Sequence, residues 1–374
     1  MATSDFNGDG LSDVLMLQGR DIAVSNLLSA GDGRFSANDA RAFNWLTAMH
    51  HFDFVVSGDF DGDGRSEFVW DVDDGYYGIQ FTDELAGFDV GLTQFFETPS
   101  GPGWTVVAAG DFDGDGIDDL LWRNADRAIL PWFASPDGKF AGNDAVVAVV
   151  FDEGWDIAGT GDFNGDGRSD LLLRNAAGMM TNMLATPGGG FANNDANALH
   201  LFGSDPVTIG DFDADGIDDL LWITPRGEVY VILTYPDGAF YPAWGAGFVS
   251  SAPEGAWLAA IGDYDGNGAD DILWQTGDAL LTWLATDDDP YTFTSVDAYG
   301  PLATDWRAAG GSLAPDGLFP AVPTVDATVP DPDTTGEGDG DDGWTVIELT
   351  GSDDGNRLVL PPDLVFESSG WIFA

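Results

Sequence analysis

Residues 110–122 read GDFDGDGIDDLLW, in which carboxylates at alternate positions precede a glycine and an apolar run follows at once. The nine-residue pattern Asp-x-[Asp/Asn]-x-[Asp/Asn]-Gly-x-x-[Asp/Glu] occurs six times, and its copies start at Asp5, Asp59, Asp111, Asp162, Asp211 and Asp263. A regular period of about 50 residues indicates a repeat architecture. Oxygen side chains at alternate positions suit a hard cation, so the repeats predict calcium sites.

Each copy assigns a ligand to positions 1, 3, 5, 7 and 9. Side chains at 1, 3 and 5 converge from one side of a tight loop, the glycine at 6 permits a positive φ, position 7 offers its backbone carbonyl, and the acid at 9 closes the far side. The predicted ligands are Asp5, Asn7, Asp9, Leu11 and Asp13; Asp59, Asp61, Asp63, Arg65 and Glu67; Asp111, Asp113, Asp115, Ile117 and Asp119; Asp162, Asn164, Asp166, Arg168 and Asp170; Asp211, Asp213, Asp215, Ile217 and Asp219; and Asp263, Asp265, Asn267, Ala269 and Asp271.

Neither an EF-hand nor a magnesium site fits the pattern as well. An EF-hand needs a bidentate Glu at position 12, and position 12 here is apolar in every copy, as at Trp70 and Trp122. Mg²⁺ keeps its waters and avoids crowded protein cages. The expected cofactor is therefore Ca²⁺, with one ion in each loop.

The third copy shows most clearly what one repeat unit contains. Residues 104–110 form a β-rich run, the loop follows, and 120–122 begin a second run. Residues 127–134 and 140–151 read as further strands, and a phrase of the type GKFAGNDA (138–145) recurs in other units. Helical periodicity is nearly absent, so we expect an all-β chain. Four short strands in about 50 residues match a propeller blade.

The composition limits stability and partners. The chain has 374 residues, no cysteine, and 65 acidic against 12 basic residues, for a net charge of −53. Such a polyanion repels nucleic acid and anionic membrane, and no apolar run is long enough to span a bilayer. The first residues do not read as a signal peptide. Acidity, calcium loops and the absence of cysteine nevertheless favour an extracellular or cell-surface location.

A seventh unit without an ion is expected after the six loops. Residues 306–322 (WRAAGGSLAPDGLFPAV) align with the third copy, but Ser312, Ala314 and Pro320 replace the ligands. The predicted units start near residues 5, 52, 104, 155, 206, 257 and 306 of a repeat region spanning 1–324.

The C-terminal residues have two possible roles. Residues 325–343 are acidic and rich in Pro and Gly, which predicts a loop or linker. Residues 344–374 are β-like. We expect them to complete the last blade, with the strand at 371–374 beside 11–17 to close the ring. The alternative is six blades and a small C-terminal extension.

The GDFDGDG-type loops resemble the FG-GAP/VCBS repeat family, which includes the integrin α-subunit head and a group of propeller lectins. The resemblance covers about residues 1–322 and departs from the pattern at Ala214, where the fifth loop lacks the usual Gly. It implies a seven-bladed β-propeller with Ca²⁺ in the loop between the first two strands of a blade. It also implies a secreted or cell-surface protein that binds proteins or glycans.

We therefore expect a calcium-stabilised binding or adhesion module for glycans or proteins. Candidate sugar-holding aromatics are Tyr76, Tyr77, Tyr235, Tyr241 and Trp244. A polysaccharide lyase or hydrolase is the alternative, but His50, His51 and His200 stand in no recognisable catalytic pattern, so we predict no catalytic residues. A structural part of a surface assembly is a third possibility.

Overall fold

The structure, a computed structural model, describes residues 4–309 except for short connecting segments. The segments outside the description are 19–22, 39–42, 45–52, 72–75, 100–102, 143–153, 176, 195–198, 201–206, 242–246, 287–288 and 303–305. Beyond residue 309, it describes only strands between 345 and 373. The chain divides into two compact units, Met1–Pro320 and Ala321–Ala374.

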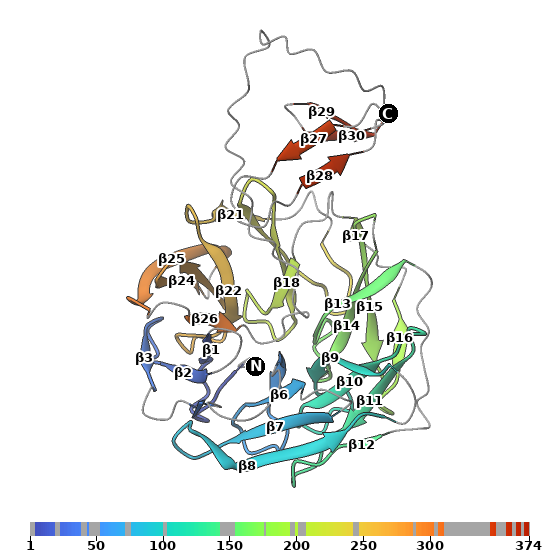
Figure 1. The fold of residues 1–374 in the computed structure, drawn as a ribbon, viewed down its shortest axis with the longest axis vertical. Coiled ribbons are helices and arrows are strands. Elements are labelled where there is room, and N and C mark those ends of the chain that lie inside the picture. The colour runs from blue at the N-terminus through green and yellow to red at the C-terminus, as the bar shows by residue number, and fades with distance from the viewer. Residues whose placement is uncertain are drawn as a thin grey trace. The chain divides into compact units, whose positions relative to one another are not determined.

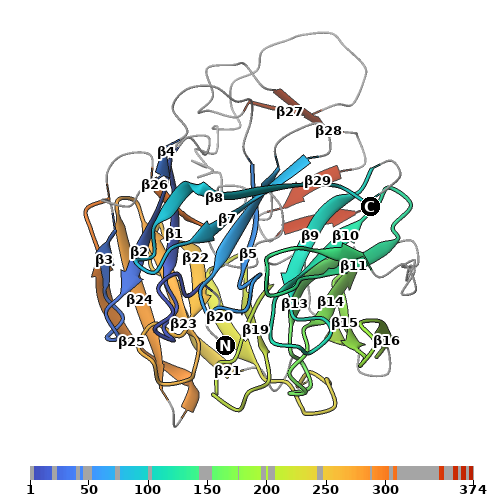
Figure 2. The ribbon, with the colours of Figure 1, turned by 90° about the horizontal axis from the view of Figure 1, so that it is seen from below.

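The first unit is a β-propeller of six antiparallel sheets arranged around a central axis (Figure 1 and Figure 2). From the axis outward, the blades are β26 (Trp306–Ala309), β1 (Val14–Gln18), β2 (Ala23–Ser29) and β3 (Phe35–Ala37) with β4 (Phe43–Asn44); β5 (Asp53–Gly58), β6 (Glu67–Asp71), β7 (Tyr76–Thr82) and β8 (Phe88–Glu97); β9 (Thr105–Gly110), β10 (Asp119–Arg123), β11 (Ile129–Phe133) and β12 (Ala141–Gly142); β13 (Trp155–Gly161), β14 (Asp170–Asn175), β15 (Met179–Ala185) and β16 (Phe191–Asn193) with β17 (Leu199–His200); β18 (Val207–Gly210), β19 (Asp219–Ile223), β20 (Glu228–Ile232) and β21 (Gly247–Ser251); and β22 (Trp257–Gly262), β23 (Asp271–Thr276), β24 (Ala279–Thr286) and β25 (Asp289–Tyr299). The described residues contain no helix, and hence none of membrane-spanning length.

The hydrophobic core lies between neighbouring blades. Between the second and third blades, for example, Val69 and Ile79 pack in one cluster with Leu120 and Trp122. The second strand of a blade is covered on both sides, so it reads as a continuous apolar run, such as the buried LLW of β10. The innermost strands of successive blades also contact one another from β5 through β9, β13, β18 and β22 to β26.

A ring of aromatic pairs follows the same order. The aromatic residue at position 2 of each acidic loop is fully buried and meets, edge to face, an aromatic ring from the outer part of the next blade. The pairs are Phe6–Phe88, Phe60–Phe140, Phe112–Phe191, Phe163–Phe240, Phe212–Phe293 and Tyr264–Phe35, with ring centroids 5.1–6.4 Å apart. The last pair joins the sixth blade to the first. The recurrent Phe of the GKFAGNDA-type phrase is thus an inter-blade contact.

The prediction of seven blades is wrong, because β26 closes the ring in the first blade. β26 pairs antiparallel with β1, with Gln18 opposite Trp306 and Leu15 opposite Ala309. The side chain of Gln275 holds this strand, since it donates to the Trp306 carbonyl and accepts from the Ala308 N–H, both at 3.2 Å. No strand precedes the first loop among the residues described from 4 onward, and residues 306–309 supply the innermost strand of the first blade. The alternative of six blades fits.

We expected the C-terminal strand to pair with residues 11–17, but β26 occupies the place beside β1. Instead β30 (Gly370–Phe373) pairs with β29 (Leu364–Glu367), and β27 (Thr345–Glu348) pairs with β28 (Arg357–Leu360). These two hairpins belong to the second unit. The proposed remnants of a seventh loop at Ser312, Ala314 and Pro320, and the linker at 325–343, lie outside the described residues.

Candidate metal centre

Five of the six acidic loops join the innermost strand of a blade to its second strand, and the first loop leads directly into β1. In each loop, position 1 organises the backbone. In the first loop, Asp5 accepts backbone N–H bonds from Gly8 and Gly10, both at 2.7 Å. Asp59, Asp111 and Asp162 accept the equivalent pairs of bonds. The glycines at positions 4 and 6 have positive φ, for example +73° at Gly62 and +84° at Gly64. The spacing of the motif therefore wraps the chain around its first carboxylate.

The acid at position 9 begins the second strand in five blades, immediately precedes β1 in the first, and is buried in every loop. In the third loop, one oxygen of Asp119 accepts from the Phe112 N–H at 3.0 Å and the other accepts from the Ala134 N–H at 2.8 Å. The second loop differs because it has a longer acid. Glu67 accepts from the Phe60 N–H at 2.9 Å, whereas its Oε1 is buried without a hydrogen-bond partner among the described residues.

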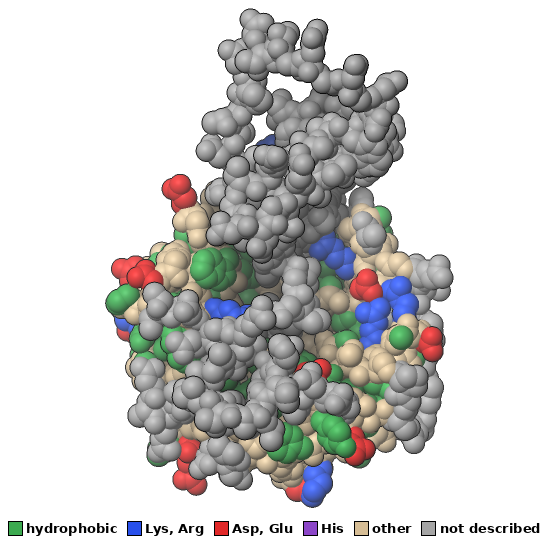
Figure 3. Space-filling view, in the orientation of Figure 1, with side chains coloured by type: hydrophobic (Ala, Val, Ile, Leu, Met, Phe, Trp, Pro, Cys, Tyr) green, Lys and Arg blue, Asp and Glu red, His purple; other side chains and the backbone are tan. Residues whose placement is uncertain are grey.

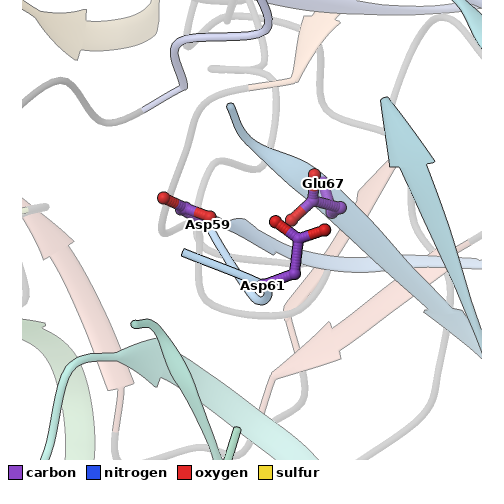
Figure 4. A group of neighbouring side chains, drawn as sticks. All are labelled: Asp59, Asp61 and Glu67. Atoms are coloured by element: carbon purple, nitrogen blue, oxygen red, sulfur yellow. The ribbon is translucent and has the colours of Figure 1, made fainter. Parts of the chain in front are cut away.

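Four loops bring three predicted ligands together. In each group, one carboxylate oxygen from every residue lies within 4.8 Å of the others. The groups are Asp59, Asp61 and Glu67, which converge in Figure 4; Asp111, Asp113 and Asp115; Asp211, Asp213 and Asp219; and Asp263, Asp265 and Asp271. The other two loops have Asn7 and Asn164 at position 3 and gather no such trio of acids in the described part of the chain.

Two properties of these loops suit a bound cation: buried oxygens without hydrogen-bond partners, and buried acids with raised pKa values. Besides Glu67 Oε1, the oxygens Asn164 Oδ1 and Asp213 Oδ1 are buried without a hydrogen-bond partner among the described residues, and all three stand at predicted ligand positions. Burial raises the pKa of Asp13 to about 7 and that of Asp219 to about 9. A bound cation would stabilise the charged form of such acids and fill the vacant coordination of the oxygens. The clusters could therefore hold metal ions.

The loops are also bonded to one another around the ring. The N–H at position 8 of each loop donates to the position 1 carbonyl of the preceding loop, at 2.6–2.9 Å. The bonds run from Ser66 to Asp5, Asp118 to Asp59, Ser169 to Asp111, Asp218 to Asp162, Asp270 to Asp211 and Ser12 to Asp263. The last bond closes the circle. We call this continuous arrangement the loop belt.

Position 8 also accounts for the glycine that precedes the motif, which sequence reasoning left unassigned. A methyl group at Gly58 would lie 2.7 Å from Asp118 Oδ2, and one at Gly110 would lie 2.5 Å from Ser169 Oγ. Asp118 in turn accepts the Asp59 N–H at 2.9 Å. The residue at position 8 is thus a positioning residue between blades. The sequence signal for this contact was the recurrent Gly before the motif together with the Ser or Asp at position 8.

The arginines at position 7 form a further interaction that the pattern did not reveal. The guanidinium of Arg168 pairs with Asp166 Oδ2 at 2.5 Å, and Arg65 pairs in the same way with Asp63. In these two loops, the predicted ligand at position 5 is therefore already bound to a cationic side chain of its own loop. The ligand role of the position 7 carbonyls stays a prediction.

The proposed sugar-holding aromatics have different positions. Tyr235 is 41% exposed and stacks on Tyr241, with ring centroids 4.0 Å apart and planes at 11°. A hydrogen bond with Tyr235 is the main cause that raises the pKa of Tyr241, and the charge of Asp213 adds to it. The charge of Asp213 also contributes to the raised pKa of Tyr291, after burial and Asp219. We call Tyr235, Tyr241 and Tyr291 the tyrosine cluster, which lies near the fifth loop.

The other candidates do not form part of this cluster. Tyr76 is exposed on the second blade and bonds to Glu97 Oε1 at 3.2 Å. Tyr77 is only 3% exposed and packs against Trp122, so its assignment to a surface was wrong. Trp244, His50 and His51 lie outside the described residues, and His200 is described only as part of the backbone of β17.

Comparisons with known proteins agree with the repeats and the propeller. The profile of the FG-GAP-like repeat matches residues 5–70 and 211–274, and that of the FG-GAP repeat matches 103–130. No curated protein matches the chain.

Several solved structures are similar to the chain at low sequence identity. An Agrocybe aegerita lectin that recognises non-reducing terminal N-acetylglucosamine superposes with a TM-score of 0.53 and 18% identity, over 82% of this chain and 84% of the lectin chain. A Pseudomonas aeruginosa periplasmic gluconolactonase gives 0.47 and 15%, over 78% and 82% of the two chains. A Burkholderia pseudomallei lectin gives 0.46 and 12%, over 80% and 86%.

The likeness to the Agrocybe aegerita lectin, at 18% identity, shows the fold alone, because one fold can carry many unrelated functions. The family resemblance rests on the repeats themselves. Their spacing, their glycine and acid positions and the profile matches agree across separate parts of the chain. The chain therefore carries FG-GAP-type repeats at residues 5–70, 103–130 and 211–274.

Proposed function

We propose that this protein is a calcium-stabilised β-propeller that binds glycans outside the cell or at its surface, without catalysing a reaction. The observation that carries the glycan assignment is the exposed ring of Tyr235, which stacks in parallel on the half-buried ring of Tyr241 close to the fifth loop. An exposed aromatic ring offers apolar contact area and a hydroxyl on one rigid side chain, which suits binding at a wet surface.

The choice of Ca²⁺ is supported by the chemistry of the ligands. The loops offer carboxylate, amide and carbonyl oxygens and neither thiol nor imidazole, and calcium takes six to eight oxygen ligands in flexible geometry. The proposed ions would fix the ends of the first two strands of each blade. The tyrosine cluster lies close to one such loop, so calcium would also stabilise the proposed sugar site.

A glycan array tests this proposal. We expect the full chain with saturating Ca²⁺ to bind a defined set of sugars, and Tyr235→Ala and Tyr241→Ala each to weaken binding at least about tenfold, since aromatic platforms carry much of such affinity. Tyr76→Ala is the matched control, because Tyr76 is equally exposed on another blade. A blank array, or full binding by both cluster variants, would overturn the glycan assignment.

A further inference from the structure

Three arginines gather at the end of the propeller opposite the loop belt. Arg123 ends β10, and Arg174 stands at the equivalent place in β14 of the next blade. Arg127 lies in the turn between β10 and β11. Because antiparallel strands alternate in direction, the end of a second strand and the turn after it lie away from the loop that precedes that strand. The chain has only 12 basic residues, so three at one place is a marked concentration.

These arginines surround one carboxylate. Asp156 Oδ1 accepts from Arg123 Nη2 at 2.8 Å and from Arg127 Nη2 at 3.0 Å, and Asp156 is the cross-strand neighbour of Arg174. Asp156 comes from β13, so the cluster spans the third and fourth blades. The Asp156 side chain is 67% exposed, and those of Arg123 and Arg127 are 24% and 28% exposed. Figure 3 shows basic side chains around an acidic one on the side of the propeller where β13 and β14 lie.

The backbone of Arg127 adopts a conformation that is unfavourable for a residue with a side chain. Arg127 has φ +65°, in the left-handed region that disfavours side chains. The equivalent turns of the next two blades hold Gly178 at +78° and Gly227 at +75°. All three residues donate the same turn hydrogen bond, to Asn124, Asn175 and Thr224 respectively. The repeats thus use glycine at this position, and only the third blade among these three uses arginine.

The arginine reaches across to the next blade. Its Nη2 donates to the Trp155 carbonyl as well as to Asp156. A residue kept in an unfavourable conformation against the habit of its own repeats points to a role for its side chain.

We propose that Arg123, Arg127 and Arg174 bind the carboxylate of an acidic saccharide, such as a uronate residue of a polysaccharide. Guanidinium groups bind carboxylates through paired, charge-assisted hydrogen bonds. Asp156 occupies these donors at the surface in the way that a ligand carboxylate would, and its exposure allows it to move aside. The saccharide class rests on the proposed glycan-binding function, whereas the anion site rests on the arginines alone.

Titration of the full chain with an oligogalacturonate, in saturating Ca²⁺ and low salt, tests this inference. We expect Arg127→Gly to weaken binding at least about tenfold while preserving the thermal midpoint, because glycine is the residue of the equivalent turns. Arg226→Gln is the matched control: Arg226 is exposed in the equivalent turn of the fifth blade, and the variant carries the same change of charge. Arg123→Gln provides a second variant with an ordinary backbone.

The outcomes separate this inference from the tyrosine cluster. Oligogalacturonate binding that Arg127→Gly abolishes and Tyr235→Ala leaves intact supports an arginine site distinct from the tyrosine cluster. Neutral sugar binding that depends on Tyr235, without any oligogalacturonate binding, overturns the arginine site alone. Equal binding of polyglutamate and oligogalacturonate would overturn the saccharide assignment. Equal loss in Arg127→Gly and Arg226→Gln would reduce the effect to general charge.

Discussion

At the scale of single residues, Glu67 is the acid whose environment most directly calls for a cation. Its Oε1 is buried without a partner among the described residues, and Asp59 and Asp61 lie beside it. Glu67→Gln keeps the shape and the acceptor for the Phe60 N–H but removes one charge from the trio.

The effect of Glu67→Gln should change sign with calcium. With Ca²⁺ we expect the variant to be less stable than wild type by about 1–3 kcal/mol, because a charged ligand is lost. After chelation it should be as stable or more stable, since one of three neighbouring like charges is gone. Chemical denaturation in both conditions measures this. Asp32→Asn, at an exposed acid outside the loops, should show no reversal.

Ala214 shows how one unusual residue is accommodated. It stands at position 4, where the other loops have glycine, and its φ is +57°. Wherever position 4 is glycine, it is covered by the side chain at position 7 of the loop that follows. A methyl group added to Gly62 would lie 2.9 Å from Ile117, and one added to Gly266 would lie 2.9 Å from Leu11. The loop that follows Ala214 has Ala269 at position 7, and this small side chain leaves room for the extra methyl group.

We therefore expect Ala269→Ile to destabilise the protein by about 1–3 kcal/mol through overpacking against Ala214. Adding Ala214→Gly should recover most of the loss, because it restores the arrangement of the other loops. A double-mutant cycle by chemical denaturation in Ca²⁺ measures the coupling. Additive effects of the two substitutions would show that these side chains do not share the space.

At the scale of strands, the local sequence pattern predicted those features of the fold that depend on nearby residues. The strands that follow the loops and the four-stranded units were readable, because each depends on residues within one period. Ring closure was not readable, because Trp306–Ala309 and Gly370–Phe373 are similar short β-runs that both begin at a tryptophan or just before one. Their choice of partner depends on contacts roughly 300 residues away in sequence, such as Met16 opposite Ala308. The bonds of the loop belt also escaped prediction, because each of them joins two different repeats.

Because β26 closes the ring, we expect the stability of the propeller to depend on β26 and not on the C-terminal strand. Ala308 is buried in the cluster that contains Met16 and Ala260. Ala308→Asp should lower the free energy of unfolding of the propeller by at least about 3 kcal/mol, because it buries a charge in an apolar site. Ile372→Asp, in β30, should leave the propeller transition in place. Calorimetry of both variants tests this prediction. Loss of the propeller transition in Ile372→Asp but not in Ala308→Asp would indicate that the C-terminal strand closes the ring.

At the scale of the whole molecule, the loop belt makes the proposed calcium sites parts of one structure. The carbonyl at position 1 of each loop is held by the N–H at position 8 of the next, between two predicted ligands of that loop. Release of one ion would loosen a loop that supports its neighbours in both directions. The ring has no free end at which loosening could stop, since Ser12 bonds to Asp263.

The propeller should therefore unfold in one transition that releases several ions. Binding to the native state alone raises stability by about 1.4 kcal/mol for each tenfold increase in free Ca²⁺ and for each ion released on unfolding. We expect a slope of several times this value, and we expect all blades to lose protection from hydrogen exchange together as Ca²⁺ is lowered. A slope that corresponds to one ion, or blades that open one by one at separate calcium concentrations, would mean that each loop acts alone and that the belt transmits nothing.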